Sequence, residues 1–342
     1  MVSRQYLHAE QNPDQDVGRN DGGQGEGNTD LEEVGVGDFV AFLAQDAEGV
    51  KHNRVILVAT KFYEAVEKEN APIYQELVRR HKEEGLSFDN VVVFNAYEYF
   101  PLNADSKHSA IGQLRERLLD HIDIKAENIH TPDGYIAQND VYEHCRTYEQ
   151  LIAAEGGIDI AMLGIGRMGN IACNEPGSHI SSTSRLILID QMSRDEMTNS
   201  FGTLEQVPPC SITMGIQTLL SAHKLFLTAW GEEKADIVQK IIEGEITDAI
   251  PATYVQTHND AKLICDLAAA SKLTRIIHPW LVTNCEWNDK TIRAAVVWLC
   301  QLLDKPILKL TNKDYNENGL SDRTDSFRED STFHWTCQSN WR

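Results

Sequence analysis

The feature that most constrains the fold is a short apolar run that ends in a glycine-rich turn. Ile158–Leu163 is apolar at five of its six positions and is short enough to be a buried parallel strand. Gly164, Gly166 and Gly169 follow, and they let the backbone turn tightly and approach a ligand without an intervening Cβ. Open α/β sheets bind ligands where a strand ends in such a loop. The stretch therefore predicts an α/β protein with a ligand site at this turn.

The rest of the chain from Arg54 onward alternates between short apolar runs and segments with helical periodicity. Such alternation predicts a parallel sheet with helices on both faces, as in Rossmann-like folds. The expected strands are Val55–Thr60, Val91–Asn95, Ile158–Leu163, Leu186–Ile189, Leu225–Ala229 and Lys262–Cys265. The expected helices are Pro72–Glu84, His108–Leu119, Val141–Ala154, Thr213–Ala222, Glu232–Glu243 and Thr291–Leu303.

Composition excludes several classes of partner. The 342 residues are 42% hydrophobic, which is enough for a sizeable core, and the formal net charge of −21 would repel a nucleic-acid backbone. No apolar run is long enough to span a membrane. The seven cysteines are scattered without a Cys-x-x-Cys pair, which predicts reduced thiols, a cytoplasmic location and no metal site.

Several motifs, taken in order, resemble the glucosamine-6-phosphate deaminase family, which shares its fold with 6-phosphogluconolactonases. The resemblance covers roughly Arg54 to Asp322. It implies a Rossmann-like fold, no cofactor, a small sugar phosphate as ligand, and a homo-oligomer. The motifs that carry it are Gly164–Pro176, Phe94–Tyr99, Val207-Pro208 with Thr213–Gly215, and Trp230–Lys234.

The resemblance also suggests how the chain is divided. Residues 1–37 are acidic and glycine-rich with few large apolar side chains, so we expect them to be disordered. Residues 38–278 would form the deaminase-like domain, 279–321 an extension with a helix, and 322–342 a loose polar tail. The extension resembles the region that leads to a zinc-dependent deacetylase-like domain in long bacterial proteins, but no His-Pro-Asp-Asp motif occurs here.

Catalytic residues of the family are partly replaced in this chain. The family's reaction opens the sugar ring, isomerises aldose to ketose and releases ammonia, using a carboxylate base and a histidine proton shuttle. Tyr97 occupies the position of the base, and a phenol with a pKa near ~10 is a poor base. Asn170 replaces the histidine, and Met168 replaces an aspartate. Glu98 and Glu175 are retained, although Glu98 is expected to point away from Tyr97 because neighbouring strand residues face opposite sides.

Phosphate-binding residues are also only partly retained. Arg185 and Lys234 match the family's phosphate cations, and Gly164, Gly166 and Gly169 match its glycine loop. Thr60 ends the first strand, where the family continues into a glycine- and serine-rich phosphate loop. This chain instead has Lys61–Ala71, without glycine and with three glutamates, which would repel a dianion.

Two functions remain open at this point. One is a working enzyme that converts glucosamine 6-phosphate to fructose 6-phosphate and ammonia. The other is a non-catalytic protein that binds a sugar phosphate or a partner. The retained Glu175, Arg185 and Lys234 favour the first; the altered base, histidine, aspartate and phosphate loop favour the second. Since four losses outweigh three retentions, we expect a family member with severely reduced deaminase activity; a lactonase would need the lost histidine too.

Overall fold

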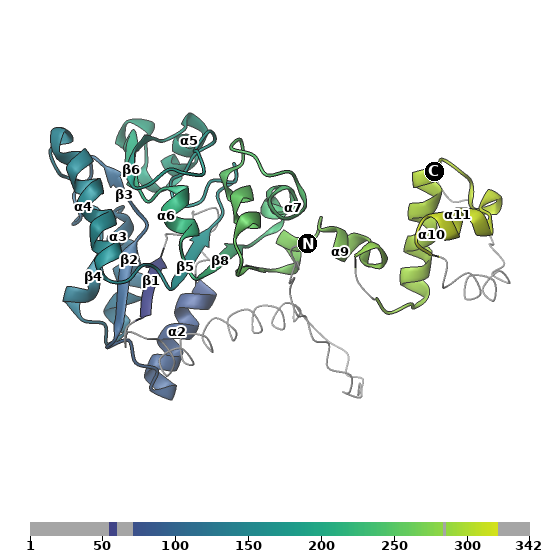
Figure 1. Ribbon diagram of the computed structural model, residues 1–342, viewed down its shortest axis with the longest axis horizontal. Coiled ribbons are helices and arrows are strands. Elements are labelled where there is room, and N and C mark those ends of the chain that lie inside the picture. Colours follow the sequence, from purple (N-terminus) through teal and green to yellow (C-terminus); the bar gives the residue numbers. More distant parts are fainter. Residues whose placement is uncertain (1–54, 60–70, 283–284, 321–342) are drawn as a thin grey trace. The chain divides into compact units, whose positions relative to one another are not determined.

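The computed structural model describes residues 55–59, 71–282 and 285–320 (Figure 1). The chain forms two compact units, one that ends at Ala270 and one that begins at Ser271. The expected disorder of residues 1–37, the looseness of residues 322–342 and the replaced segment Lys61–Asn70 lie outside the described residues. The expected domain boundary at residue 278 stays a prediction.

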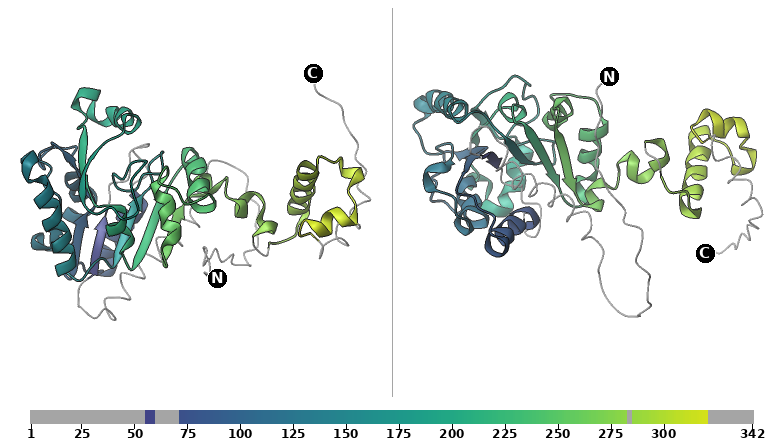
Figure 2. Two further views of the ribbon diagram at one scale, coloured as in Figure 1. Left: turned by 45° about the horizontal axis from the view of Figure 1, so that its top comes forward. Right: turned by 60° about the horizontal axis from the view of Figure 1, so that its bottom comes forward.

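The first unit is built on a six-stranded sheet whose order is β4-β2-β1-β5-β8-β9, with all neighbouring strands parallel (Figures 1 and 2). This arrangement confirms the predicted Rossmann-like α/β class. All the strands therefore end at one edge of the sheet, where loops from different strands meet. The strands are β1 (Val55–Ala59), β2 (Val91–Asn95), β4 (Ile129–His130), β5 (Ile160–Gly164), β8 (Lys224–Ala229) and β9 (Ala261–Cys265).

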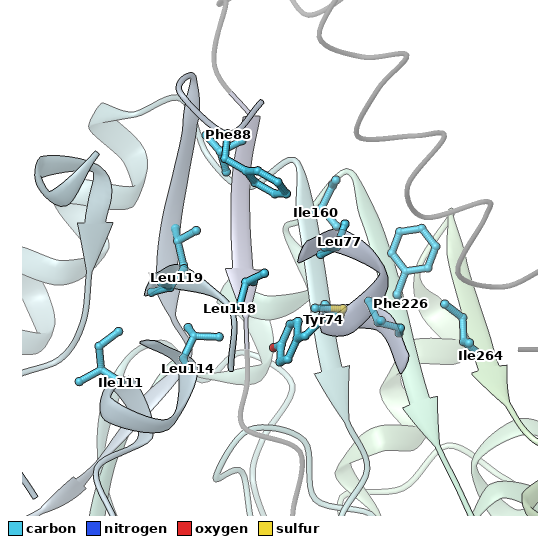
Figure 3. Packing of buried hydrophobic residues seen from close by; sticks show 14 of the residues in the cluster. Tyr74, Leu77, Phe88, Ile111, Leu114, Leu118, Leu119, Ile160, Phe226 and Ile264 are labelled. Carbon is cyan, nitrogen blue, oxygen red and sulfur yellow. The ribbon is translucent and has the colours of Figure 1, made fainter. Parts of the chain in front are cut away.

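Helices cover both faces of this sheet. On one face, Tyr74 and Leu77 of α2 (Ala71–Glu84) pack in one cluster with Ile160 and Phe226 from the strands, as Figure 3 shows. On the other face, Phe94 of β2 contacts the α4 helix (Val141–Ala154) through an edge-to-face ring pair. Both layers exclude water, so every residue of β2 and β5 is buried. This two-sided burial explains why the strands read as unbroken apolar runs.

A second sheet, which is three-stranded and antiparallel, lies beyond the carboxyl ends of the parallel strands. The alternation of apolar and helical segments in the sequence did not predict this sheet. Its order is β3-β7-β6, formed by β3 (Tyr97–Phe100), β7 (Cys210–Thr213) and β6 (Arg185–Leu188). The expected strand Leu186–Ile189 is therefore real but belongs to this sheet. Strand length and apolarity do not specify a partner, so the sequence could not distinguish the two sheets.

The expected helices are present, Val141–Ala154 with the predicted bounds and the others with shifted bounds, and one expectation was wrong at its start. Thr213 ends β7, and the helix predicted from Thr213 begins only at Ile216, because the backbone there pairs with β3 and β6. The α5 helix was not predicted. The remaining α-helices among the described residues of this unit are α3 (Ala110–Arg117), α5 (Gln191–Phe201), α6 (Ile216–Leu220), α7 (Ala235–Glu243) and α8 (Leu267–Ala270).

The second unit is helical and has its own small core. Its helices are α9 (Thr274–Ile277), α10 (Asp289–Leu303) and α11 (Asn312–Glu317). Ala295 and Leu299 of α10 pack with Leu320, and the three tryptophans Trp280, Trp287 and Trp298 surround them. In neither unit does a described helix have the length and apolar character needed to cross a bilayer.

Replacing Leu77 by alanine should destabilise the first unit by about 3 kcal/mol, because the side chain is fully buried between α2 and the sheet and its loss leaves a cavity. Urea denaturation followed by circular dichroism would measure the change. Lys82→Ala is the matched control, because Lys82 is exposed on the same helix. Equal stabilities of the two variants would contradict the packing described here.

Candidate functional site

The glycine loop closes on itself directly after β5. The amide of Gly166 donates to the carbonyl of Asn170 at 2.9 Å, and the amide of Gly169 donates to the carbonyl of Gly166 at 2.9 Å. Gly169 has a φ of +73°, and a Cβ there would collide with Ile250. A Cβ on Gly166 would occupy the space of the Asn170 amide side chain. Both positions therefore require glycine, for backbone conformation and for space.

Tyr97 and Asn170 both lie in the protein interior, with exposed fractions of 0% and 2%. Tyr97 pairs with Thr213 across β3 and β7, and Thr213 pairs in turn with Arg185 on β6. Directly paired residues of antiparallel strands share one face of the sheet. The hydroxyl of Thr213 accepts a hydrogen bond from the amide of Cys173 at 3.2 Å. This face of the small sheet is therefore the one that meets the glycine loop.

Glu98 has a different environment from its neighbour. Its carboxylate accepts from the backbone amides of Tyr99, Ala110 and Ile111 at 2.9 to 3.1 Å and from the hydroxyl of Ser109 at 2.8 Å. Two of these donors are the first amides of α3, which have no partner within the helix, and a third is the hydroxyl of the N-cap residue Ser109. A buried carboxylate held by four donors at a helix N-terminus suits an anchoring role rather than proton transfer.

Arg185 lies half-buried on β6 and faces the Asn-Glu-Pro turn that follows the glycine loop. One terminal nitrogen donates to Oδ1 of Asn174 at 2.9 Å, and the other donates to the hydroxyl of Ser178 at 3.0 Å. Among the described residues its guanidinium makes no ion pair with a carboxylate, and burial lowers the pKa of Arg185. Because its described acceptors are neutral, the guanidinium of Arg185 can still form a charge-assisted hydrogen bond with an anionic ligand.

Lys234 reaches the same loop from the end of β8. It is buried, and its ammonium group donates to the carbonyl of Ile165 at 2.9 Å. The residue lies in a short 3-10 turn, Glu232–Lys234, that follows Gly231 with a φ of +86°. The carbonyl bond fixes the charge of Lys234 beside Gly164 and Gly166. Lys234, in the turn after β8, therefore contacts the glycine loop, and Arg185 of β6 contacts the Asn-Glu-Pro turn that follows it.

Glu175 is the titratable residue of the Asn-Glu-Pro turn. Burial raises the pKa of its carboxyl to about 7, and the charge of Asp190 adds to the rise, while a hydrogen bond from Ser193 of α5 at 3.3 Å opposes it. A carboxyl with this pKa exchanges protons near neutrality. It lies beside Asn174 in the chain, so it belongs to the same turn that holds Arg185.

The structure brings together most of the predicted site residues at the edge where the parallel strands end. Asn170 lies in the glycine loop and Lys234 bonds to it. Glu175 and the partners of Arg185 lie on the turn that follows the loop, and Tyr97 shares a sheet face with Thr213 and Arg185. The carboxylate of Glu98 is instead bonded to α3. Thr60 lies outside the described residues.

Sequence reasoning missed the residues that hold this arrangement together. Asn174 donates from Nδ2 to the carbonyls of Ile171 and Met214 at 3.1 and 2.8 Å, in addition to accepting from Arg185. Thr213 and Ser178 join the loop to β7 and to Arg185. The Asn-Glu-Pro motif contained the signal for Asn174, but nothing in the sequence specified which carbonyls it would reach.

An open parallel sheet with a glycine loop, one buried cation and one half-buried cation near the carboxyl ends of its strands is typical of α/β proteins that bind small anionic molecules. Comparison with known proteins narrows this class. The family described as glucosamine-6-phosphate isomerases/6-phosphogluconolactonase matches residues 68–265. The chain therefore belongs to that family.

Individual relatives agree with the assignment. A putative glucosamine-6-phosphate deaminase-like protein of Bacteroides thetaiotaomicron is 62% identical over 255 residues, which are 74% of this chain but only 38% of that protein. The chain thus spans well under half the length of this relative. A glucosamine-6-phosphate deaminase of Shouchella clausii is 41% identical over 205 residues, covering 60% of this chain and 82% of that protein.

Solved structures resemble the same part of the chain. A monomeric glucosamine-6-phosphate deaminase superposes with a TM-score of 0.63 at 30% identity, covering 71% of this chain and 95% of that one. A 6-phosphogluconolactonase from Thermotoga maritima superposes with a TM-score of 0.52 at 17% identity, covering 69% and 94%, which shows the shared fold alone. The predicted family is confirmed.

The raised pKa of Glu175 should make stability depend on pH. The folded value of about 7 lies above the ordinary value of 4.5, so this group's contribution is full below about 4.5 and is lost as pH rises through 7. Glu175→Gln removes the titration. Between pH 5 and pH 8 the unfolding free energy of the variant should therefore rise by about 2.5 kcal/mol relative to that of wild type.

Urea unfolding of both proteins at the two pH values would measure this difference. Glu143→Gln on the exposed side of α4 controls for general charge effects. A difference between wild type and Glu175→Gln that does not change with pH would show that Glu175 ionises normally in the fold.

Proposed function

We propose that this protein binds a phosphorylated hexose at the glycine loop and converts glucosamine 6-phosphate to fructose 6-phosphate and ammonia far more slowly than an ordinary enzyme. The observation that carries the proposal is the contrast between two sets of residues in one site. Arg185 bonds to the Asn-Glu-Pro turn and Lys234 bonds to the glycine loop before it. Tyr97 and Asn170, at the positions for proton transfer, are buried and are neutral residue types.

The chemistry explains why these replacements matter. Moving a proton between two sugar carbons needs a base whose pKa lies near the working pH. A phenol is too weakly acidic to supply its anion at neutrality, and an amide does not exchange protons at all in this range. Glu175 retains a suitable pKa, but a single carboxyl cannot serve both as the base and as the shuttle to the ring oxygen.

Binding a sugar phosphate requires fewer functional groups in the site than catalysis does. Charge-assisted bonds from a guanidinium and an ammonium group, added to backbone amides of a glycine loop, hold a phosphate without any proton transfer. A non-catalytic ligand-binding protein remains the alternative, and a turnover of zero would favour it. A cytoplasmic location and a homo-oligomer both remain predictions.

Ammonia release from glucosamine 6-phosphate tests the proposal directly. Wild type should turn over well below the ~1–1000 per second of ordinary enzymes. The double variant Tyr97→Asp with Asn170→His should raise the rate by at least about tenfold, while each single change should do little, because groups that act as a unit are non-additive. The pair Tyr97→Phe with Asn170→Ala, which adds no base, is the matched control. A wild-type turnover within the ordinary range would refute the proposal.

Binding can be tested independently of turnover. Millimolar glucosamine 6-phosphate should raise the melting temperature of wild type, since a ligand that binds only the folded state stabilises it. Arg185→Ala should abolish that ligand-dependent rise, whereas Arg146→Ala, an exposed arginine paired with Glu143 on α4, should keep it. Protection that survives Arg185→Ala would place the ligand elsewhere.

A further inference from the structure

The turn that carries Lys234 is held by an acid from the neighbouring strand. Asp266 directly follows the last residue of β9, and both of its carboxylate oxygens accept from the amide of Gly231, two residues beyond β8, at 3.1 Å. One of these oxygens also accepts from the amide of Ala269 in α8 at 2.8 Å. A single half-buried carboxylate therefore joins the segment after β8 to the helix after β9.

Gly231 passes this restraint on to Lys234 through its backbone. Its amide donates to Asp266, and its carbonyl accepts from the amide of Lys234 at 3.1 Å, which closes the short 3-10 turn. Gly231 has a φ of +86°, and glycine adopts many backbone conformations with similar ease. The bonds that Gly231 makes, more than its own preference, therefore set the direction in which the turn leaves β8.

Lys234 lies at the end of this turn, against the glycine loop. Its side chain is 6% exposed, and its ammonium group donates to the carbonyl of Ile165 at 2.9 Å. The four-carbon stem of a lysine is flexible, so the place of its charge depends on where the backbone holds its Cα. Asp266, Gly231, Lys234 and Ile165 thus form one bonded path across the adjacent strand ends of β9, β8 and β5.

Two further acids, Glu232 and Glu233, lie on the same turn and are exposed. As negative charges, these two residues and Asp266 all oppose the binding of an anion nearby, because like charges repel. As an acceptor of two backbone amides, Asp266 would instead favour binding by keeping Lys234 in place. Removal of Asp266 therefore has opposite effects on phosphate affinity in the two cases: tighter binding if its charge dominates, weaker binding if its hydrogen bonds dominate.

We propose that Asp266 is a positioning residue of the phosphate site, which holds the Gly231 turn so that the ammonium group of Lys234 reaches the phosphate of a bound hexose. The inference rests on the proposed binding of a phosphorylated hexose at this site. It adds a residue outside the motifs that the sequence analysis selected. Asp266 acts through Lys234 and does not itself contact the ligand.

Isothermal titration calorimetry with glucosamine 6-phosphate at pH 7 tests this role. Asp266→Ala should weaken binding about tenfold, the effect of one misplaced charge-assisted hydrogen bond, although it removes a negative charge. In Asp266→Asn the amide oxygen can take the place of Oδ1, which accepts from both Gly231 and Ala269, so this variant should restore most of the affinity. Glu232→Ala removes an exposed carboxylate from the same turn and is the matched control, which should not weaken binding.

A double-mutant cycle separates positioning from a general loss of stability. In the Lys234→Ala background, Asp266→Ala should cause no further loss of affinity, because a residue that acts through Lys234 has nothing left to position. Independent, additive losses would overturn the inference. If Lys234→Ala binds too weakly to measure, the comparison of wild type with Asp266→Ala and Asp266→Asn decides the question. If Asp266→Ala does not fold, Gly231→Ala takes its place, because a Cβ disfavours the φ of the same turn and should weaken binding in the same way.

The outcomes for the inference and for the proposed function are distinct. Binding by Asp266→Ala that equals or exceeds that of wild type would refute the positioning role and leave the proposed binding function intact. If wild type does not bind glucosamine 6-phosphate at millimolar concentration, the proposed function fails, and this inference fails with it.

Discussion

The side chain of Asn174 is the constraint on which the candidate site depends. Its amide group donates to carbonyls of the glycine loop and of Met214 after β7, and its oxygen accepts from Arg185 on β6. These hydrogen bonds together fix the orientation of the fully buried Asn174 side chain. Leaving any of its buried partners without a hydrogen bond would cost about 1–3 kcal/mol of stability. One residue therefore joins the parallel sheet, the antiparallel sheet and the cation that faces the ligand edge.

Sequence reasoning succeeded where local pattern and physical cause coincide. The buried runs of β2 and β5 predicted parallel strands, because two-sided burial leaves no room for alternating polarity. The positions of Gly166 and Gly169 predicted a tight turn, and both prove to need glycine, one for space and one for its backbone angle. The family and fold followed from these motifs and their order.

Sequence reasoning failed where long-range pairing decides the outcome. Thr213 was assigned to a helix because the residues after it are helical, yet it is held by strands on both sides. The antiparallel sheet combines segments more than a hundred residues apart, such as Tyr97 and Thr213, and no local pattern encodes that register. The second compact unit shows the same limit, because the three tryptophans around its core come from separate segments.

The anchoring of Glu98 has a consequence for its neighbour. Three donors at the start of α3 hold β3 through the side chain of Glu98, and none of these bonds involves the side chain of Tyr97. The contacts that hold this strand in place are thus separate from the side chain at the position of the catalytic base. In this part of the molecule, architecture and chemistry depend on different residues.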